Sequence, residues 1–466
     1  MFNSFSFTIP PLDLFQPQRY TQLMRQRYMI LLLPILIASL LSCSPGHLGS
    51  NEIAFIRDGH LWTIDPNGEN AYAIVTENTP VISYAWSPTH QVIAYRSLDA
   101  DFAKTASAKH VEHNPLTDTV PDLPSTVNTI SIDGGSSIPI MFSNPDTIYS
   151  QPIWNETGTR MIFRQLAKGN SQSPDAALWW VAQNDQPGGI ATKILPHSFS
   201  IPSLTYTSQS AIGNDLTGVF SAKIDGQDKT LLIHGNLPGH PLPASLERVL
   251  PQPIHQKPAL LYARDITQTT GNQPITVQLL LYTTDGQNKV LTTCACTQFT
   301  WSPDGNEILY SAGSTFTVLY LKDNTSFNIA GAYGSIPYWS PDSQFLLLDG
   351  PHSLILLQLA KKQQQTLLHD TVVTTSSTSS GFSPQSTNAL LQPISNNLWA
   401  SDSRHFLFLT RTRLLWQNHS LHSGNGLYTV TIDADGHPQG KPVIVDSGND
   451  TQAGWTYEDA NTSFLF

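Results

Sequence analysis

A tryptophan-centred motif recurs along this chain and constrains its fold more than any other feature. A Trp stands before a turn sequence of the type Ser-Pro-Asp-Gly, and a short apolar run follows the turn. The copies are Trp86-Ser87-Pro88-Thr89 before Val92–Ser97, Trp154-Asn155-Glu156-Thr157-Gly158 before Met161–Arg164, Trp301-Ser302-Pro303-Asp304-Gly305 before Ile308–Ser311, Trp339-Ser340-Pro341-Asp342-Ser343 before Phe345–Leu348, Trp399-Ala400-Ser401-Asp402-Ser403 before Phe406–Phe408, and Trp455-Thr456-Tyr457-Glu458-Asp459 before Phe464–Phe466. Such self-similarity predicts a repeat architecture.

A second pattern follows the first, in which an apolar run ends in an Asp-Gly turn. It occurs at Leu61–Gly68, Ile130–Gly135, Leu280–Gly286 and Val430–Gly436. Pro presets φ at the first turn position, Asp bonds to its own backbone and Gly accepts a positive φ, so both turns have a mechanism. Each unit therefore reads as strand, turn, strand, loop, strand, turn, strand, which is a four-stranded antiparallel meander.

One such meander cannot bury both of its faces, and stacking copies around an axis supplies the missing neighbour. We therefore predict an all-β fold, a β-propeller of four-stranded antiparallel blades, with the repeat Trp residues in the core between blades. Eight blades are favoured, and seven are the alternative because the fourth unit has no Trp motif. The units cover residues 51–79, 82–142, 150–197, 200–236, 247–294, 297–331, 334–370 and 395–446.

These residues resemble the TolB-like, WD-type propeller repeats of bacterial envelope proteins, in which Trp-Ser-Pro-Asp-Gly precedes an Ile-Ala-Tyr/Phe strand. The resemblance covers nearly everything after residue 50 and implies a propeller domain over 51–466. The first unit lacks a Trp-motif strand, and we expect Trp455–Phe466 to supply it. Pairing the two ends removes exposed edges, which closed architectures require.

The N-terminal segment has the organisation of a secretion signal. Met24–Tyr28 is a charged region, Met29–Leu41 is an apolar run too short to span a bilayer, and Ser42-Cys43 follows. Leu40-Leu41-Ser42-Cys43 resembles the lipobox of bacterial lipoproteins, in which a signal peptidase cuts before a Cys that carries a diacylglycerol on sulfur. The alternative is an ordinary secretory signal with an incidental Cys.

The lipobox resemblance implies a signal peptide over 1–42 and a lipidated linker over 43–50. Residues 1–23 are either an extended charged region or lie upstream of a mis-assigned start, and we favour the latter. Acyl chains such as palmitate contribute about 0.8 kcal/mol per buried methylene, and more than one chain makes attachment stable. We expect the mature protein on the cell membrane or outer envelope, facing the extracytoplasmic side.

Composition argues against two further classes of function. Lys and Arg number 24 against 35 Asp and Glu, so the formal charge is -11 with only 13% charged residues. An acidic chain without a basic block cannot release many phosphate counterions, so no nucleic-acid partner is expected. Apart from the N-terminal run, no apolar stretch approaches the roughly 20 residues that a membrane helix needs. Membrane attachment is therefore expected through the lipid anchor alone.

Two cysteines remain once Cys43 is assigned to the lipid. Cys294 and Cys296 are separated by Ala295, and residues i and i+2 of a strand point to the same face. A metal site would need two more soft ligands, and the chain has no other Cys. A local disulfide in an oxidising compartment and a pair of half-buried small residues are both open.

A search for catalytic motifs finds no Gly-x-Ser-x-Gly, no His-Glu-x-x-His and no P-loop. We predict no catalytic residue, no cofactor and no metal site. Two groups are candidates for a binding face. His110, Glu112 and His113 lie in a long insertion, where the alternative to a metal or ligand contact is a solvated loop. Arg411, Arg413 and Trp416 could form a cation and aromatic platform, although Trp416 could equally pack on its own blade.

The lengths of the loops indicate which face of the propeller binds a partner. Connections between strands one and two and between three and four lie on one rim of a propeller, where the short turns fall. The long connections belong to the other rim: Leu98–Val127, Lys168–Ala176 and Arg411–Gly426 within blades, and Asn236–Gln256 and Thr371–Asn397 between them. Long loops on a rigid scaffold are where binding usually sits.

Two functions remain open at this point. The favoured one is a lipid-anchored, monomeric binding or scaffold protein for another envelope protein or a glycan. The alternative is a propeller enzyme that acts on oligosaccharides at the axial mouth. Such an enzyme would need polar residues that converge from several blades, and the fold alone does not decide between the two.

Overall fold

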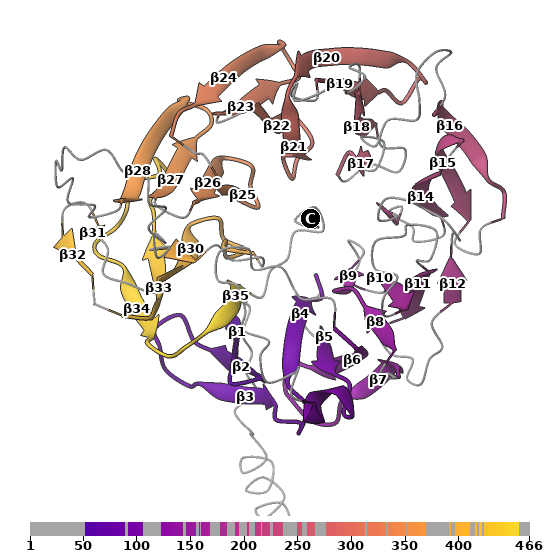
Figure 1. Ribbon diagram of the computed structural model, residues 1–466. Coiled ribbons are helices and arrows are strands. Elements are labelled where there is room, and N and C mark those ends of the chain that lie inside the picture. The colour runs from indigo at the N-terminus through magenta and orange to yellow at the C-terminus, as the bar shows by residue number, and fades with distance from the viewer. Residues whose placement is uncertain are drawn as a thin grey trace, which may run out of the picture. The chain divides into compact units, whose positions relative to one another are not determined.

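The computed structural model describes residues 52–88, 92–105, 123–142, 146–154, 158, 160–167, 178–183, 192–194, 203–204, 210–215, 217–223, 227–235, 249–253, 259–265, 276–312, 315–331, 334–350, 353–369, 391–392, 397–410, 415–416, 419–421 and 424–455. The chain divides into two compact units, Met1–Leu48 and Gly49–Phe466, and every described element lies in the second. This unit is an all-β propeller of eight blades around a central axis (Figure 1), which confirms the predicted fold class and blade number. Among the described residues, no helix has the length and apolar character needed to cross a bilayer.

The first four blades are antiparallel sheets. Blade 1 contains β35 (Thr451–Trp455), β1 (Ile53–Arg57), β2 (His60–Ile64) and β3 (Tyr72–Val75); blade 2 contains β4 (Val81–Trp86), β5 (Val92–Leu98), β6 (Ser125–Ser131) and β7 (Ile138–Met141); blade 3 contains β8 (Thr147–Tyr149), β9 (Ile153–Trp154), β10 (Arg160–Ala167), β11 (Leu178–Gln183) and β12 (Thr192–Ile194); blade 4 contains β13 (Ser203–Leu204), β14 (Ser210–Asp215), β15 (Gly218–Lys223) and β16 (Thr230–His234). In blade 3 the innermost strand is split, since β8 and β9 both pair with β10.

The other four blades follow the same order from the axis outward. Blade 5 contains β17 (Val249–Pro251), β18 (Leu260–Asp265), β19 (Val277–Tyr282) and β20 (Asn288–Cys294); blade 6 contains β21 (Cys296–Trp301), β22 (Glu307–Ala312), β23 (Thr315–Tyr320) and β24 (Thr325–Ile329); blade 7 contains β25 (Ile336–Trp339), β26 (Phe345–Asp349), β27 (Ser353–Gln358) and β28 (Gln363–His369); blade 8 contains β29 (Leu391–Gln392), β30 (His405–Thr410), β33 (Gly426–Thr431) and β34 (Val443–Asp446). β31 (Leu415–Trp416) and β32 (His419–Ser420) extend blade 7 rather than blade 8.

The Ser-Pro-Asp turns are closed by the side chains that the motif supplies. Ser302 Oγ donates to Asp304 Oδ1 over 2.7 Å and accepts from the Glu307 amide over 2.9 Å. Ser340 repeats this arrangement with Asp342 and Phe345. Because both turns hold the same geometry, the strands on either side begin in the same register.

The six repeat Trp residues are buried, with exposed fractions of 0 to 4%: Trp86, Trp154, Trp301, Trp339, Trp399 and Trp455. Three of their indole N–H groups donate to a carbonyl of the preceding blade: Trp154 to Ala85 over 3.1 Å, Trp301 to Leu250 over 3.0 Å and Trp399 to Tyr338 over 3.0 Å. The surrounding apolar clusters each combine residues of neighbouring blades. The core therefore lies between the blades, where each sheet buries the face that it cannot cover alone.

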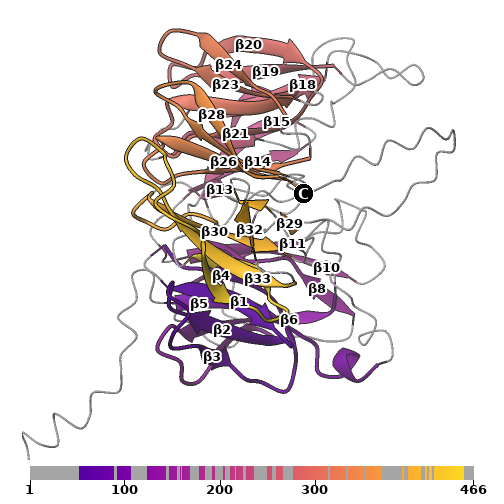
Figure 2. The same ribbon diagram turned by 90° about the vertical axis from the view of Figure 1, so that its left-hand side faces the viewer.

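The ring closes between the two ends of the described chain. β35 pairs antiparallel with β1, with Ile53 opposite Trp455 and Ala54 opposite Gly454. The closing strand is therefore Thr451–Trp455, whereas the sequence placed it over Trp455–Phe466. The reason is that the repeat Trp ends the first strand of its blade, as Trp86 and Trp301 also do. Figure 2 shows the yellow strands of blade 8 beside the indigo strands of blade 1.

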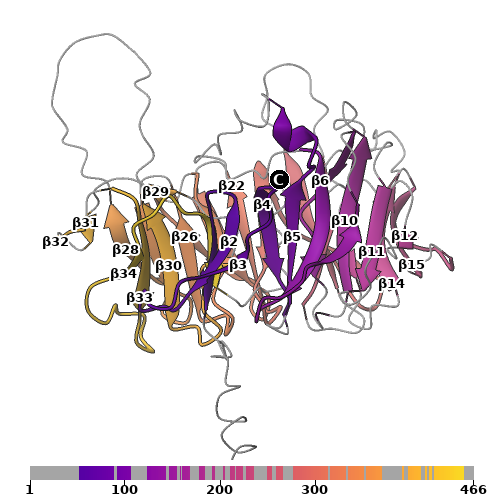
Figure 3. The same ribbon diagram turned by 90° about the horizontal axis from the view of Figure 1, so that it is seen from below.

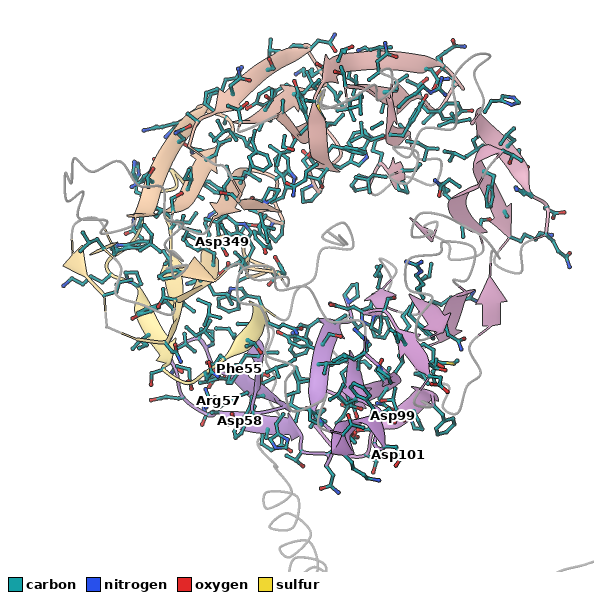
Figure 4. The ribbon with its side chains drawn as sticks, in the orientation of Figure 1. Phe55, Arg57, Asp58, Asp99, Asp101 and Asp349 are labelled. Carbon is teal, nitrogen blue, oxygen red and sulfur yellow. A yellow bond between two sulfur atoms is a disulfide. The ribbon has the colours of Figure 1, made fainter. Side chains whose placement is uncertain are left out.

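A charged cluster lies next to this closure. Arg57, at the end of β1, donates from Nε to Asp450 Oδ1 over 2.8 Å and also forms an ion pair with Asp446. Its guanidinium carbon lies 4.9 Å from the centre of the Phe55 ring, and Figure 4 labels both residues. The two carboxylates raise the pKa of Arg57 although burial acts to lower it. The cluster ties the first strand of the chain to the segment that leads into the last one.

Cys294 and Cys296 form a disulfide, so one of the two open alternatives is realised. Cys294 ends β20 at the outside of blade 5, and Cys296 begins β21 of blade 6. Both side chains are half-buried against the apolar cluster shared by blades 5 and 6. The bridge therefore spans a blade-to-blade crossing that contains only Ala295.

Candidate functional site

The two rims of the propeller differ in what they carry. Successive connections of an antiparallel sheet alternate between its two ends, so the links from strand one to two and from three to four share one rim, named here the turn rim. The links from strand two to three and the links between blades share the other, named here the loop rim. The loop rim carries the connections over 99–124, 168–177, 235–248, 370–390 and 411–425.

The loop rim carries longer connections than the turn rim only where the longest connections are compared. The two longest turn-rim connections among blades 5 to 8 cover 393–404 and 432–442, and the sequence treated the second as one of the short turns. The second is anchored, because Asp433 Oδ1 accepts from the amides of Asp435 and His437. The loop rim also contains tight turns, such as Asp58-Gly59, where both φ angles are positive.

The insertion over 99–124 starts and ends on an ordered base. Asp99 is 5% exposed, and its Oδ1 accepts from the amides of Asp101 over 3.0 Å and Phe102 over 2.8 Å. These contacts start the 3-10 helix η1 (Phe102–Lys104), which lies at the loop rim in Figure 3. The Asp99 amide donates to Pro124 O over 2.8 Å, which ties the two ends of the insertion together. Figure 4 labels Asp99 and Asp101.

Apolar and polar contacts below η1 fix this base to blade 2. Phe102 is buried with Ile82 and Leu98 in a small cluster of its own. Two further bonds follow the strands beneath: Ser97 and Thr126 share a hydroxyl contact of 2.7 Å, and Asn128 Nδ2 donates to Thr126 Oγ1 over 2.8 Å. The insertion is therefore presented from a rigid platform.

The insertion over 411–425 is anchored differently. β31 pairs with the outer strand β28 of blade 7, with Leu368 opposite Trp416 and His369 opposite Leu415. Trp416 is 1% exposed and stacks on Phe408, with ring centres 6.1 Å apart and planes at 6°. Phe408 in turn stacks on Tyr428 at 5.1 Å. This segment of blade 8 thereby covers part of the exposed edge of blade 7.

The candidate binding residues are placed as follows. Trp416 is buried where blades 7 and 8 meet, since its strand pairs with β28 of blade 7 and its ring stacks on Phe408 of blade 8. Its ring is therefore not a surface platform, whereas the sequence had left packing on its own blade as the alternative. Arg411 and Arg413 lie outside the described residues, as do His110, Glu112 and His113. Within the described part of the chain, no three His, Cys, Asp or Glu side chains gather where they could hold a metal ion.

One surface residue of this region was not anticipated. Phe142 starts the connection between β7 and β8 and has 63% of its surface exposed, more than any other large apolar side chain of the described residues. Its carbonyl accepts from Tyr149 Oη over 3.3 Å, which holds the backbone to blade 3. Exposed aromatic side chains on a fixed backbone are the type of residue that anchors protein interfaces. Its position directly after an apolar strand was the only signal in the sequence.

One carboxyl group on the turn rim has a raised pKa. Burial, together with the nearby charge of Asp304, raises the pKa of Glu307 to about 7. The pKa of Asp304 itself is lowered, because Ser302 and Asn306 donate to its carboxylate although burial acts in the other direction. Both residues belong to a blade 6 turn whose bonds are structural. Their pKa shifts therefore make the stability of the fold depend on pH and do not indicate a functional site.

The chain has similarity to known proteins only at the level of solved structures. No protein-family model matches the chain, and no curated protein matches it. Among solved structures, the chain is similar to one described as a eukaryotic initiation factor, with a TM-score of 0.48, 11% identity and coverage of 87% of this chain and 98% of that one.

The chain is also similar to two further solved structures, at lower TM-scores. An oligogalacturonate lyase in complex with manganese has a TM-score of 0.42 at 12% identity, over 62% of this chain and 78% of that one. TolB from Acinetobacter baumannii has a TM-score of 0.33 at 15% identity, over 60% of this chain and 63% of that one. At these identities the similarities concern the fold alone.

Proposed function

We propose that this chain is a lipid-anchored propeller of the bacterial cell envelope that binds another envelope protein or a glycan through its loop rim. The observation that carries the proposal is that the four longest connections all belong to the loop rim: 99–124, 235–248, 370–390 and 411–425. Lengthening a surface loop costs little wherever it occurs, so neutral drift does not require one rim to collect the insertions. The ordered bases at Asp99 and Trp416 add to this, because anchored loops lose less entropy on binding.

Membrane attachment in this proposal rests on Cys43. The apolar run before it is too short to remain as an anchor, and the residues Leu40-Leu41-Ser42 match a lipobox. Mass spectrometry of the N-terminal peptide from the mature protein tests this step. A thioether-linked diacylglycerol on Cys43 supports it, and an unmodified residue 43 or a retained apolar segment contradicts it.

Binding is tested with a matched pair of surface variants. Phe142→Ser removes an exposed apolar side chain at the loop-rim end of blade 2, and Val290→Ser removes one that is 50% exposed on the outer strand of blade 5. A central aromatic contact of an interface contributes about 2 kcal/mol or more, which is a roughly 30-fold change in affinity. We expect F142S to reduce capture of partners from a solubilised envelope fraction and V290S to leave it unchanged.

A larger change provides a second test of the same surface. Replacing 106–122 by a short Gly-Ser linker keeps Asp99, η1 and Pro124, so the platform beneath the insertion is retained. Circular dichroism and thermal melting verify that each variant is folded. If both folded loop-rim variants capture partners as well as the unchanged protein, the loop rim is not the binding surface. Turnover of an oligosaccharide by the purified protein would instead favour an enzyme.

A further inference from the structure

The Cys294–Cys296 disulfide lies on the loop rim. Cys294 ends the fourth strand of blade 5 and Cys296 begins the first strand of blade 6, so the bond stands in a link between blades. Their Cα atoms are 5.1 Å apart, against about 6.6 Å for residues i and i+2 of an extended strand. The chain therefore turns at Ala295, and the disulfide closes this corner.

The backbone on both sides of the corner is held without the covalent bond. Each cysteine is paired within its own blade, Cys294 with Val277 and Cys296 with Ala312. Because these ladders fix both Cα positions, the two sulfur atoms remain neighbours after the bond between them is reduced. A reduced pair is therefore positioned to close again.

The contact between blades 5 and 6 also does not depend on this bond. The Trp301 indole donates to Leu250 O over 3.0 Å, and Gln252 Nε2 donates to Gly305 O over 2.9 Å. An apolar cluster that both blades share lies behind the corner. A disulfide that closes so short a loop restricts the unfolded chain little. Stabilisation of the fold therefore gives little reason for a disulfide at this place.

The disulfide is partly accessible to solvent. Both cysteine side chains are partly exposed at the border of the shared apolar cluster, and the neighbouring Thr293 is exposed. The rate of thiol–disulfide exchange depends on access of the attacking thiolate to sulfur. Each cysteine also has a second thiol one residue away that can resolve a mixed disulfide. We propose that Cys294 and Cys296 form a thiol–disulfide exchange site, with a dithiol of another protein as its substrate.

The exchange has two steps. A thiolate of the external dithiol attacks one of the two sulfur atoms, which breaks the Cys294–Cys296 bond and leaves a mixed disulfide and one free cysteine thiolate. The second thiolate of the external dithiol then attacks its own sulfur in the mixed disulfide and releases the other cysteine. Two electrons and two protons pass from the dithiol to Cys294 and Cys296, and the external pair leaves as a disulfide.

The first test measures whether the folded protein exchanges. Dithiothreitol serves as the external dithiol, and alkylation followed by mass spectrometry of the peptide that contains both cysteines reports the reduced fraction, so Cys43 is read separately. The same reaction is run on the protein unfolded in urea. If the disulfide were reached only by unfolding the propeller, the fold would slow its reduction by about 1000-fold or more. We expect a smaller factor, with the circular dichroism spectrum of the folded protein retained; slowing by 1000-fold or more overturns the proposal.

The second test shows whether one cysteine resolves the intermediate formed at the other. Oxidised glutathione, added to the reduced protein, should re-form the internal disulfide without a lasting adduct. The matched variants Cys294→Ser and Cys296→Ser lack the second thiol, so at least one of them should retain a glutathione adduct on the remaining cysteine. If neither folded variant takes up glutathione, or if the unchanged protein retains the adduct, the pair is not an exchange site.

The exchange site goes beyond the binding function proposed above and does not rest on it. Both tests use small thiols and disulfides as probes, so they require no captured partner and no lipid anchor. Capture by the F142S and V290S variants decides the binding function separately.

Discussion

Removing β35 should open the ring. The variant that ends at Asp450 loses Thr451–Trp455, and every residue of this strand is buried. A matched variant that ends at Trp455 keeps the whole strand and removes only the residues after it. We expect the first variant to be unfolded or aggregated at 25 °C and the second to melt close to the full chain, because only the first exposes the inner edge of β1.

The free energy of unfolding lost with β35 follows from the contacts of that strand. Trp455 is 1% exposed, and loss of a buried Trp side chain costs about 3 to 5 kcal/mol. Gln452 Nε2 donates to Ile82 O over 2.7 Å, and Thr451 Oγ1 donates to Ile56 O over 3.2 Å. Each contributes about 1 kcal/mol. The sum of about 5 to 7 kcal/mol lies within the 5 to 15 kcal/mol that stabilises a whole domain.

The assay is thermal unfolding of the three forms monitored by circular dichroism, and size-exclusion chromatography detects aggregates. The expected order of melting temperature is full chain, then the form that ends at Trp455 with little loss, then the form that ends at Asp450 far below both. If the form lacking β35 melts with the full chain, the closing strand has no energetic role and the reasoning fails. If instead the form ending at Trp455 collapses, the closing segment extends beyond Trp455.

Three further outcomes follow from particular residues. The pKa of Glu307 is raised to about 7 in the fold, so the folded protein favours the protonated side chain, and the stability this contributes is present below the unfolded pKa near 4.5 and is lost as pH rises through 7. Glu307→Gln should therefore raise the melting temperature at pH 8 and not at pH 4.5. Equal effects at both pH values would contradict this. Reduction of the Cys294–Cys296 disulfide should lower the free energy of unfolding by less than about 2 kcal/mol, since so short a loop restricts the unfolded chain little; loss of folding in a reductant would show a larger role. Trp301→Phe should lower the free energy of unfolding, measured by denaturant titration, by about 1 kcal/mol more than Trp339→Phe does. The reason is that the Trp301 indole donates to Leu250 O, whereas the Trp339 indole has no partner among the described residues. Equal losses would exclude the indole hydrogen bond as a stabilising contact.

The repeat made most of the fold predictable. A Trp before a Ser-Pro-Asp turn is a local pattern, and local turn chemistry determines where two strands meet, so blade number and blade order followed from the motif. The closing strand was placed too late because the pattern shows where Trp455 stands and not which side of it is paired. Pairing depends on β1, which is far away in the sequence.

Other features had no local signal. β31 consists of Leu415 and Trp416, too short for an alternating pattern, and its partner β28 belongs to another blade. Arg57 meets Asp446 and Asp450 only because the ring brings the two ends together. For the binding surface, the topology of a meander was enough to assign connections to rims. The sequence could not show the burial of Trp416 or the exposure of Phe142, because both depend on packing between strands.

Hydrogen exchange of the propeller, free and bound to its captured envelope partner, tests the loop-rim proposal most directly. Binding should slow exchange in peptides that contain η1, Phe142 and the β31–β32 hairpin, and should leave the turns at 302–306 and 340–344 unchanged. Protection confined to the turn rim, with the loop rim exchanging at its free rate, would contradict the account.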